Sequence, residues 1–543
     1  MIHNPIIKGC NPDPSMLRLG EDYYIATSTF EWNPGLALYH SRDLQNWELI
    51  NYALNKPTQL NLTGLSTAMG IWAPCLTYCD RRRKFYLIYS FVYNIQGQYF
   101  DLDNFIVESN AIAGPWSNPT YVNSTGFDPS LFHEDGRQWI VNLVWENRTG
   151  YEHPGYITLQ EWDADLKCLI GMPKIISRGG TDRGCLEAPH LYKRGDYYYL
   201  MTAEGGTGYG HSVVISRSRN INGPFEPDPK GVVLTSQPND FNERGIDDCY
   251  KFHQYNPDAE LQKAGHGSLV ETHTGELYIV HLCARPFLPE LRCMLGREVA
   301  IQKCYETPDG WIRMVTGDNL ARLTTESPSF KKSPENTIDY QPNTVFCSAI
   351  LPIEFQTYRI PATEKWLSFA AGKGLGLRGQ GSLFTTRDKS LIARRIQSFN
   401  CEASTTMSFS PENIHQSAGL VVYYSAINFY YLRVYNSESL GGKTLGIMLS
   451  DLGNKQELKE SRVRLPENAS IALRVTIVHK KLQFWYSFDK KEWIKVGGVL
   501  NTTILSDEYG GQKFTGTFVG IFCQDLYTKC NISYFENFSY QDL

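Results

Sequence analysis

Short apolar runs bounded by turn residues recur along the first 320 residues of the chain. Five of them follow an acidic or glycine turn and are rich in aromatic and β-branched residues, which is typical of strands. Their sequences are EDYYIATST (21–29), RKFYLIYSF (83–91), GRQWIVNLVWE (136–146), GDYYYLMTAEGG (195–206) and GELYIVHLCAR (275–285). The 3.6-residue periodicity of amphipathic helices is nearly absent. The pattern predicts an all-β protein.

These strands mark a repeat of about 60 residues. Further strand patterns follow each of them, and the last unit is stretched by an insertion around residues 232–262. A single unit is one sheet that cannot bury both of its faces alone, whereas radial packing of neighbouring units buries them. Five units therefore predict a five-bladed β-propeller over residues 1–323. An array of β-sandwiches, the competing arrangement, leaves the motifs between the repeats unexplained.

One motif precedes each aromatic strand: NPDPSML, IWAPCLT, GFDPSLF, LEAPHLY and GHGSLVE. Aligned on the proline, or on the glycine of the fifth motif, five residues share one register: Asp13, Ala73, Asp128, Ala188 and His266. Trp72 and Glu187 lie one position earlier. Because the first strand of every blade lines the central channel, equivalent positions should meet at one point. Three carboxyl groups, those of Asp13, Asp128 and Glu187, are expected there.

This cluster of carboxyl groups favours acid–base chemistry. Burying like charges close together is costly and raises at least one pKa, so structural needs alone would not place three acids in one channel. The structural alternative for Asp13 is a turn, since it stands between Pro12 and Pro14. The shared register argues against that alternative.

Net charge and composition limit the classes of partner that the protein is expected to bind. The net charge of −5 and the pI of about 6.2 supply no basic field for nucleic acid or anionic lipid. The first residues lack the features of a signal peptide, and no apolar run is long enough to span a membrane. We therefore expect a cytoplasmic protein with no nucleic acid or membrane partner. Thirteen cysteines without CxxC pairs fit reduced thiols.

The motifs NPDPS, GFDPSLF, CLEAPHLY, EGGTGYGHSV and LGRE, in this order, resemble glycoside hydrolase family 43, in particular its two-domain β-xylosidases. These enzymes share some activity with α-L-arabinofuranosidases. The resemblance covers essentially the whole chain and implies an inverting hydrolase that requires no cofactor. By motif, Asp13 would be the general base and Glu187 the general acid. Asp128 would modulate the pKa of the acid and orient it.

Physical reasoning supports these roles. Inversion needs an acid for the leaving oxygen and a base that activates water on the opposite face of the sugar, about 6.5–9.5 Å apart. Asp13 and Glu187 belong to blades one and four, on different sides of the channel. An ionised Asp128 nearby would raise the pKa of Glu187 and keep it protonated near neutral pH.

Aromatic and cationic residues are candidates for sugar binding. Trp72 shares the register of Glu187 and suits stacking on a pyranose, although a core tryptophan is the alternative. Phe30 and Trp145 stand at the ends of aromatic strands in blades one and three and would wall the pocket, with ordinary blade packing as the alternative. Arg297 would bind sugar hydroxyls or an aspartate, the alternative being an ion pair with Glu298.

His266 is the fifth residue of the shared register. The family sometimes places a metal or a water network at this channel histidine, so calcium near His266 is one alternative. A single histidine is a weak metal signal, because metal sites need several ligands at fixed geometry. We expect a polar channel residue, with no certain metal ligand and with a structural or activating calcium near His266 as the alternative.

After residue 323 the propeller pattern stops. Residues 324–343 form a polar, proline-containing linker, and residues 344–543 alternate apolar and polar positions. They predict a second β-domain, a jelly-roll or concanavalin-like sandwich. A carbohydrate-binding module is its generic interpretation. The family resemblance instead implies a domain that sends a loop into the active site, with Phe514 closing the pocket. The alternative is that Phe514 lies in the core of its own domain.

We expect an exo-acting enzyme that releases xylose from the non-reducing end of short β-1,4-xylo-oligosaccharides. An α-L-arabinofuranosidase acting on arabinoxylan fragments is the alternative within the class, and a non-catalytic sugar-binding propeller the alternative outside it. Three buried acids would only destabilise a binding protein. Enzymes of this kind often assemble, so we expect a homo-oligomer.

Overall fold

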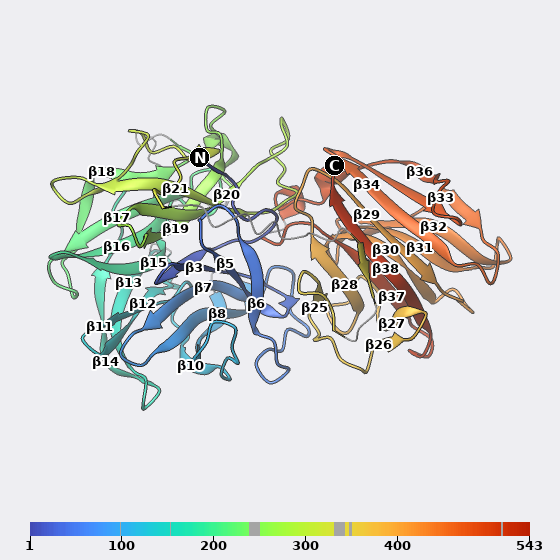
Figure 1. Ribbon diagram of the computed structural model, residues 1–543, viewed down its shortest axis with the longest axis horizontal. Coiled ribbons are helices and arrows are strands. Elements are labelled where there is room, and N and C mark those ends of the chain that lie inside the picture. The colour runs from blue at the N-terminus through green and yellow to red at the C-terminus, as the bar shows by residue number, and fades with distance from the viewer. Residues whose placement is uncertain (98, 152–153, 238–249, 331–342, 347–349, 512–513) are drawn as a thin grey trace.

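The computed structural model describes the whole chain except residues 98, 152–153, 238–249, 331–342, 347–349 and 512–513. Two β-domains lie side by side, the propeller coloured blue to yellow-green and the sandwich golden yellow to red (Figure 1). The helical elements within the described residues are three short 3₁₀ turns, η1 (Phe252–Gln254), η2 (Thr502–Ile504) and η3 (Tyr509–Gly511). The all-β prediction is confirmed. No helix among the described residues has the length and apolarity to cross a membrane.

Five four-stranded antiparallel sheets form the blades. Blade one contains β2 (Ser15–Leu19), β3 (Asp22–Thr27), β5 (Gly35–Ser41) and β6 (Glu48–Leu54). Blade two contains β7 (Gly70–Cys79), β8 (Lys84–Gln96), β9 (Tyr99–Ser109) and β10 (Thr120–Asn123). Blade three contains β11 (Ser130–Glu134), β12 (Arg137–Val144), β13 (Tyr156–Asp163) and β14 (Cys168–Ser177). Blade four contains β15 (Glu187–Arg194), β16 (Tyr197–Glu204), β17 (Ser212–Ser218) and β18 (Glu226–Thr235). Blade five contains β19 (Gln262–Glu271), β20 (Leu277–Ala284), β21 (Glu298–Glu306) and β22 (Ile312–Met314).

The first strand of each blade lines the channel, as the repeat predicts. β2 contacts β7, β7 contacts β11, β11 contacts β15, β15 contacts β19, and β19 contacts β2, which closes a ring. The aromatic strands found in the sequence are the second strands of the blades. The N-terminus strengthens the closure, because Ile7 bridges Val299 of blade five and β1 (Ile2–His3) pairs with β23 (Thr324–Thr325).

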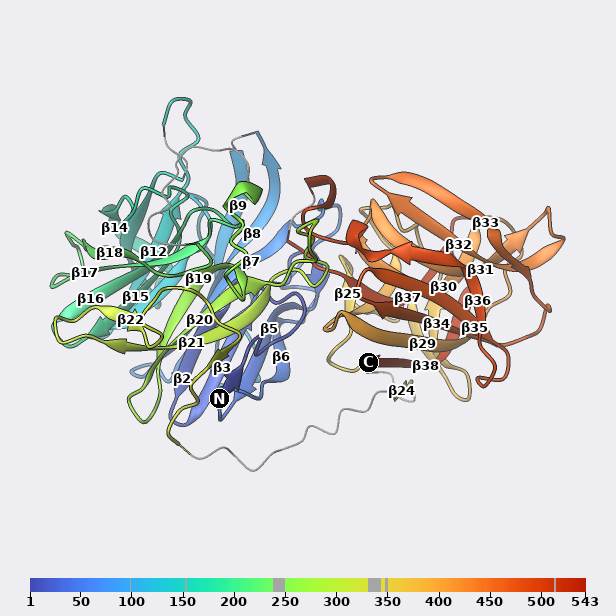
Figure 2. The same cartoon turned by 90° about the horizontal axis from the view of Figure 1, so that it is seen from above.

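The second domain is a sandwich of two sheets around one core, in which Leu420, Leu473 and Phe484 are buried. The first sheet has the strands β24 (Asn343–Val345), β26 (Leu367–Ala370), β27 (Gly374–Arg378), β29 (Asn400–Ser408), β34 (Ile471–Val478), β35 (Lys481–Ser487), β36 (Ile494–Asn501) and β38 (Ile532–Asp542). The second has β25 (Gln356–Tyr358), β28 (Ser390–Arg395), β30 (Gln416–Ser425), β31 (Asn428–Ser437), β32 (Gly442–Asp451), β33 (Asn454–Arg464) and β37 (Phe518–Asp525). Figure 2 shows the two layers from above.

The propeller supplies the last strand of the second sandwich sheet. β4 (Trp32–Asn33), which follows the aromatic strand of blade one, pairs with β25 of the sandwich. Trp32 is buried in an aromatic cluster of the sandwich that includes Tyr358 and Phe518. The two domains therefore share a sheet and a core, which repeat patterns within either domain do not reveal.

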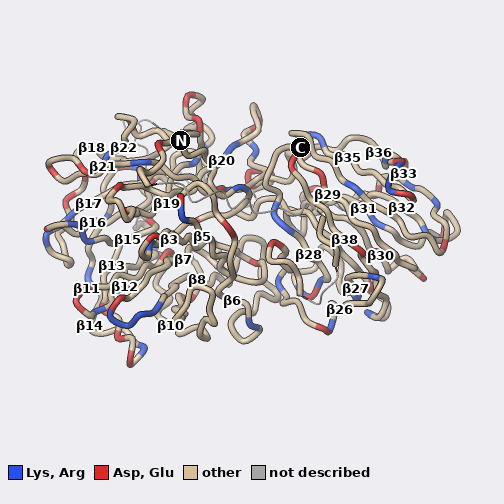
Figure 3. The backbone as a smooth tube through the Cα atoms, viewed as in Figure 1, with Lys and Arg blue, Asp and Glu red and all other residues tan. Residues whose placement is uncertain are grey.

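Most of the predicted linker, residues 331–342, lies outside the described residues. Both ends of the predicted linker are paired strands, since β23 pairs with β1 and β24 pairs with β38. Lysine, arginine, aspartate and glutamate are interspersed over both domains (Figure 3).

Candidate active site

The five residues of the shared register have the same unusual backbone conformation. Their φ angles are positive: 58° at Asp13, 41° at Ala73, 54° at Asp128, 52° at Ala188 and 47° at His266. Residues other than glycine rarely adopt this conformation, and it persists only where the surrounding structure enforces it. In blades two, four and five, the ladder between the first two strands shifts register at this point. The sequence alignment thus corresponds to five equivalent kinks at one end of the channel.

The three predicted carboxyl groups lie together. Asp13, Asp128 and Glu187 are between 6% and 8% exposed, and each lies close enough to influence the ionisation of another. Asp13 and Asp128 precede the first strands of blades one and three, and Glu187 begins that of blade four. The channel end therefore gathers acids from three blades in a buried setting.

Asp13 is held by hydrogen bonds and positive charge. The Ser28 hydroxyl donates to Asp13 Oδ2 over 2.7 Å, and Arg297 Nη1 donates to Asp13 Oδ1 over 3.4 Å. The backbone N–H of Ala73 donates to Ser28 Oγ over 2.7 Å, which leaves the serine proton directed at Asp13. These donors fix the orientation of the Asp13 carboxyl group.

Burial and the charge of Asp13 raise the pKa of Glu187 to about 8. The positive charges of Arg297 and Lys251 act in the opposite direction. Burial, followed by the charges of Glu187 and Asp13, also raises the pKa of Asp128 well above its ordinary value. The Ala188 N–H donates to Asp128 Oδ2 over 3.1 Å and favours the anion of Asp128. Burial and Asp13 are thus the causes that raise the pKa of Glu187, whereas the sequence predicted that Asp128 would be the cause.

Two polar residues of the site, Ser28 and Lys251, were not predicted from the sequence. Ser28 directly follows β3, which ends at Thr27, and nothing in the local sequence indicated its contact with Asp13 on the neighbouring strand segment. Lys251 lies in the predicted insertion, of which residues 238–249 are outside the described residues. It is 2% exposed and adopts a positive φ of 47° just before η1. Because the insertion has no blade pattern, the repeat could not place Lys251 beside Glu187.

Aromatic side chains wall one side of the site. Trp72 meets Phe30 edge to face at 6.2 Å between ring centroids, and its Nε1 donates to the Ala68 carbonyl over 2.8 Å. Trp145 lies farther along, 4.3 Å from Phe100 and 5.7 Å from Phe127. The predicted Phe30, Trp72 and Trp145 thus belong to one wall, and all three are also part of the propeller core or packed on it.

Two further rings of this wall were not predicted. Phe100 and Phe127 lie 6.3 Å and 6.0 Å from Trp72. Phe127 directly precedes Asp128 in GFDPSLF, which was an available signal.

Phe514 reaches the propeller from the sandwich. Its ring lies 6.3 Å from Phe30 in a stacked orientation and 5.9 Å from Trp72 edge to face. The guanidinium carbon of Arg297 lies 4.5 Å from the ring centroid. Phe514 therefore packs on the propeller cluster, which rules out burial in its own sandwich core.

Arg297 connects this ring to the acids. It contacts Phe514 on one side and Asp13 on the other. The alternative pairing with Glu298 does not form, because Glu298 accepts hydrogen bonds from Arg285 over 2.7 Å and 2.9 Å.

His266 lies beside Asp13, with 3.6 Å between His266 Nδ1 and Asp13 Oδ1. Burial and the nearby Arg297 charge lower its pKa, while Asp13 acts against them. The described residues contain no group of three or more histidine, cysteine, aspartate or glutamate side chains arranged to hold a metal ion. His266 thus faces the carboxyl group of Asp13 and the positive charge of Arg297.

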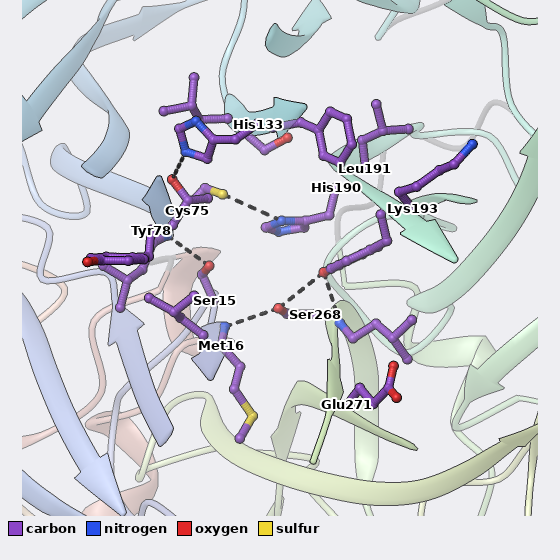
Figure 4. A pocket seen from close by; sticks show the side chains of 18 of the residues that line it. Ser15, Met16, Cys75, Tyr78, His133, His190, Leu191, Lys193, Ser268 and Glu271 are labelled. Carbon is purple, nitrogen blue, oxygen red and sulfur yellow. Dashed lines mark hydrogen bonds between the residues drawn. The ribbon is translucent and has the colours of Figure 1, made fainter. Parts of the chain in front are cut away.

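A cavity of about 530 Å³ lies farther along the same channel. Figure 4 shows side chains from all five blades around it, including Ser15, Cys75, His133, His190 and Ser268. His190 lies between the cavity and the acids, because its ring is 6.4 Å from His266 while its Nδ1 faces Cys75 Sγ at 3.7 Å. None of the three acids lines this cavity, so we place the chemistry at the other end.

Comparison with known proteins agrees with the fold. Residues 2–312 match the model of glycosyl hydrolases family 43, and residues 343–541 match the β-xylosidase C-terminal concanavalin A-like domain. The chain therefore belongs to glycosyl hydrolase family 43 and is a glycoside hydrolase.

Individual relatives match over nearly their full length. A xylosidase/arabinosidase 43B of Humicola insolens is 42% identical over 99% of this chain and 97% of its own. A β-xylosidase of Bacillus subtilis is 42% identical over 100% of this chain and 99% of its own. The crystal structure of a xylan β-1,4-xylosidase from Bacillus halodurans superposes with a TM-score of 0.94 at 42% identity, covering 100% of both chains.

Proposed function

We propose that this enzyme releases single xylose units from the non-reducing end of short β-1,4-xylo-oligosaccharides, with inversion at the anomeric carbon. The observation that carries the proposal is the buried cluster of Asp13, Asp128 and Glu187 at a channel end across which Phe514 packs. The names of the relatives support xylosides as the substrate class.

Asp13 acts as the general base. The hydrogen bonds from Ser28 and Arg297 orient its carboxylate, which takes a proton from a water molecule. The water oxygen forms a bond to the anomeric carbon as the bond to the leaving oxygen breaks. Because the attack comes from the face opposite the leaving group, a β-glycoside gives the α-sugar.

Glu187 acts as the general acid and protonates the leaving oxygen. Its pKa of about 8 keeps the proton on the carboxyl at neutral pH. Asp128 and Glu187 repel each other as anions, so one of them holds a proton. Asp128 accepts the Ala188 N–H, which favours its anion, and we therefore assign the proton to Glu187. Asp128 then stabilises the protonated acid and orients it.

The wall of the site explains the expected exo action. Trp72, Phe30 and Phe514 offer aromatic faces to a sugar ring, and Arg297 offers donors to its hydroxyl groups. Phe514 packs across from Phe30 and Trp72, which supports a pocket closed behind one terminal sugar. No cofactor enters this mechanism.

A second activity, on α-L-arabinofuranosides, is favoured by the relative named xylosidase/arabinosidase. The two terminal sugars present similar hydroxyl groups to one pocket. Purified enzyme assayed with p-nitrophenyl β-D-xylopyranoside and p-nitrophenyl α-L-arabinofuranoside tests both proposals. We expect the larger kcat/KM on the xyloside. A larger value on the arabinofuranoside would exchange the two assignments, and activity on neither would contradict both.

A further inference from the structure

A buried ion pair joins the loop that carries Phe514 to the propeller. Lys263 of β19 forms a short ion pair with Glu508 of the sandwich, and their side chains are 2% and 0% exposed. The backbone N–H of Cys293 donates to the other Glu508 oxygen over 2.7 Å. Removing one partner of such a pair leaves an uncompensated buried charge.

The neighbouring Asp507 fixes the same loop from within. Its Oδ1 accepts the Tyr424 hydroxyl over 2.9 Å and lies 3.4 Å from the N–H of Gly516, which it accepts as well. The Tyr250 hydroxyl, from the propeller, donates to the Asp507 backbone carbonyl. Asp507 thus ties the segment before Phe514 to the segment after it.

The segment after Phe514, which leads back into the sandwich, is also held against the propeller. The Thr517 N–H donates to the Met294 carbonyl of the propeller over 3.0 Å, and its hydroxyl donates to the Leu505 carbonyl over 2.7 Å. Gly516 has a positive φ of 60°, and a Cβ there would lie 2.5 Å from Cys10 Cβ. The loop therefore packs closely against the propeller at Met294. This residue precedes Arg297 by three positions in the chain.

The ion pair is not needed to join the two domains. They already share the sheet in which β4 pairs with β25, and Trp32 is buried in the sandwich. The pair is located instead where the loop meets blade five. Lys263 is three residues from His266 on the same strand. The ion pair therefore fixes the loop to the strand that lies beside Asp13.

We propose that Lys263, Glu508 and Asp507 form an interdomain anchor that positions Phe514 against Arg297 and Trp72 and so sets the affinity for the terminal sugar. These three are positioning residues, since the anchor acts on the sugar through Phe514. The inference rests on the proposed function for its kinetic consequence, and on contacts alone for its structural one.

The kinetic test is a double-mutant cycle between Glu508→Gln and Phe514→Ala. We expect Glu508→Gln to raise KM on xylobiose about tenfold or more, corresponding to about 1.4 kcal/mol, with a smaller change in kcat. In the Phe514→Ala background the same substitution should leave KM nearly unchanged, because residues that act as one unit are not additive. An equal rise in both backgrounds, or no rise in either, would overturn the proposal.

Two further variants keep the test interpretable. The double variant Lys263→Met/Glu508→Gln removes both charges of the pair, so that Lys263 is not left buried without its partner, and is expected to fold, with KM raised as in Glu508→Gln. The control is Asp228→Asn, which breaks a buried ion pair with Arg313 that joins blades four and five away from the loop. It should lower the melting temperature and leave KM as in the wild type. A KM rise of equal size in the control would also overturn the proposal.

Amide hydrogen exchange separates this inference from the proposed function. The N–H groups of residues 515–517 should exchange faster in Glu508→Gln than in the wild type, whether or not xylobiose is a substrate. If the wild type hydrolyses no xyloside, the proposed function fails and the exchange result still decides on the anchor. Unchanged exchange in this segment would overturn the anchor even in an active enzyme.

Discussion

Trp32 of the propeller stacks on Phe518 of the sandwich, with 3.8 Å between ring centroids and 11° between the ring planes. Trp32 is 1% exposed, and its partner begins β37, four residues after Phe514. The contact therefore joins the two domains close to the loop that carries the pocket residue Phe514.

Replacing Trp32 by alanine should destabilise both domains together. Loss of a buried tryptophan costs about 3–5 kcal/mol, and this one belongs to the shared core. Denaturant unfolding followed by fluorescence and by circular dichroism measures the free energy of unfolding. The control is Trp139→Ala, a half-buried tryptophan on blade three, which should cost much less. A loss in Trp32→Ala no larger than in the control would show that the shared core contributes little.

Substitutions of Glu187 and Asp13 should differ in how the remaining activity depends on the leaving group of the substrate. In Glu187→Ala, an aryl xyloside with an activated leaving group needs little protonation and should retain much of its rate, while xylobiose should lose about 10²–10⁴-fold. In Asp13→Ala both substrates should lose activity, because no base activates the water. The measurement is kcat/KM on both substrates. Equal losses on the two substrates in Glu187→Ala would contradict its role as acid.

Two substitutions should move the alkaline limb of the pH profile in opposite directions. The positive charge of Lys251 lowers the pKa of Glu187, so Lys251→Met should shift the alkaline limb of kcat/KM to higher pH. Asp128→Asn removes a negative charge beside Glu187 and should shift it to lower pH. As control, Lys193→Met at the far cavity of the channel should leave the limb in place. Shifts of the same sign in the first two variants would contradict the electrostatic account.

The raised pKa of Glu187 also predicts a pH-dependent stability. Its pKa rises from 4.5 to about 8 on folding, so the folded state retains a proton that the unfolded state loses between these values. The group therefore contributes stability at low pH that is lost as the pH rises through this window. Glu187→Gln lacks this loss, so its melting temperature relative to the wild type should be higher at about pH 9 than at about pH 5. A difference that does not change with pH would contradict the raised pKa.

Much of the fold and the position of the acids could be predicted from sequence because the propeller repeats. Each blade places the same short motif at the same kink, so Asp13, Asp128 and His266 align without knowledge of the structure. The repeat shows the same position five times, once in each blade. The sandwich could be predicted as a domain from its alternating strands.

Contacts between the domains could not be predicted in the same way. Lys263 and Glu508 are separated by 245 positions, and nothing in either local sequence indicates the other. Trp32 follows an aromatic strand of blade one, and no pattern distinguishes a pocket aromatic from one that enters the neighbouring domain. Lys251 lies in an insertion that breaks the repeat. Burial is the first cause of the raised pKa of Glu187, and an alignment of motifs does not show how deeply a side chain is buried.

The stereochemistry of the first product tests the central claim most directly. The roles of Asp13 and Glu187 require a single displacement by water at the anomeric carbon. Proton NMR during the first turnovers of xylobiose, before mutarotation, should show α-xylose as the product released from the non-reducing end. Release of β-xylose first would show a double displacement through a covalent intermediate and would contradict the assignment of both residues.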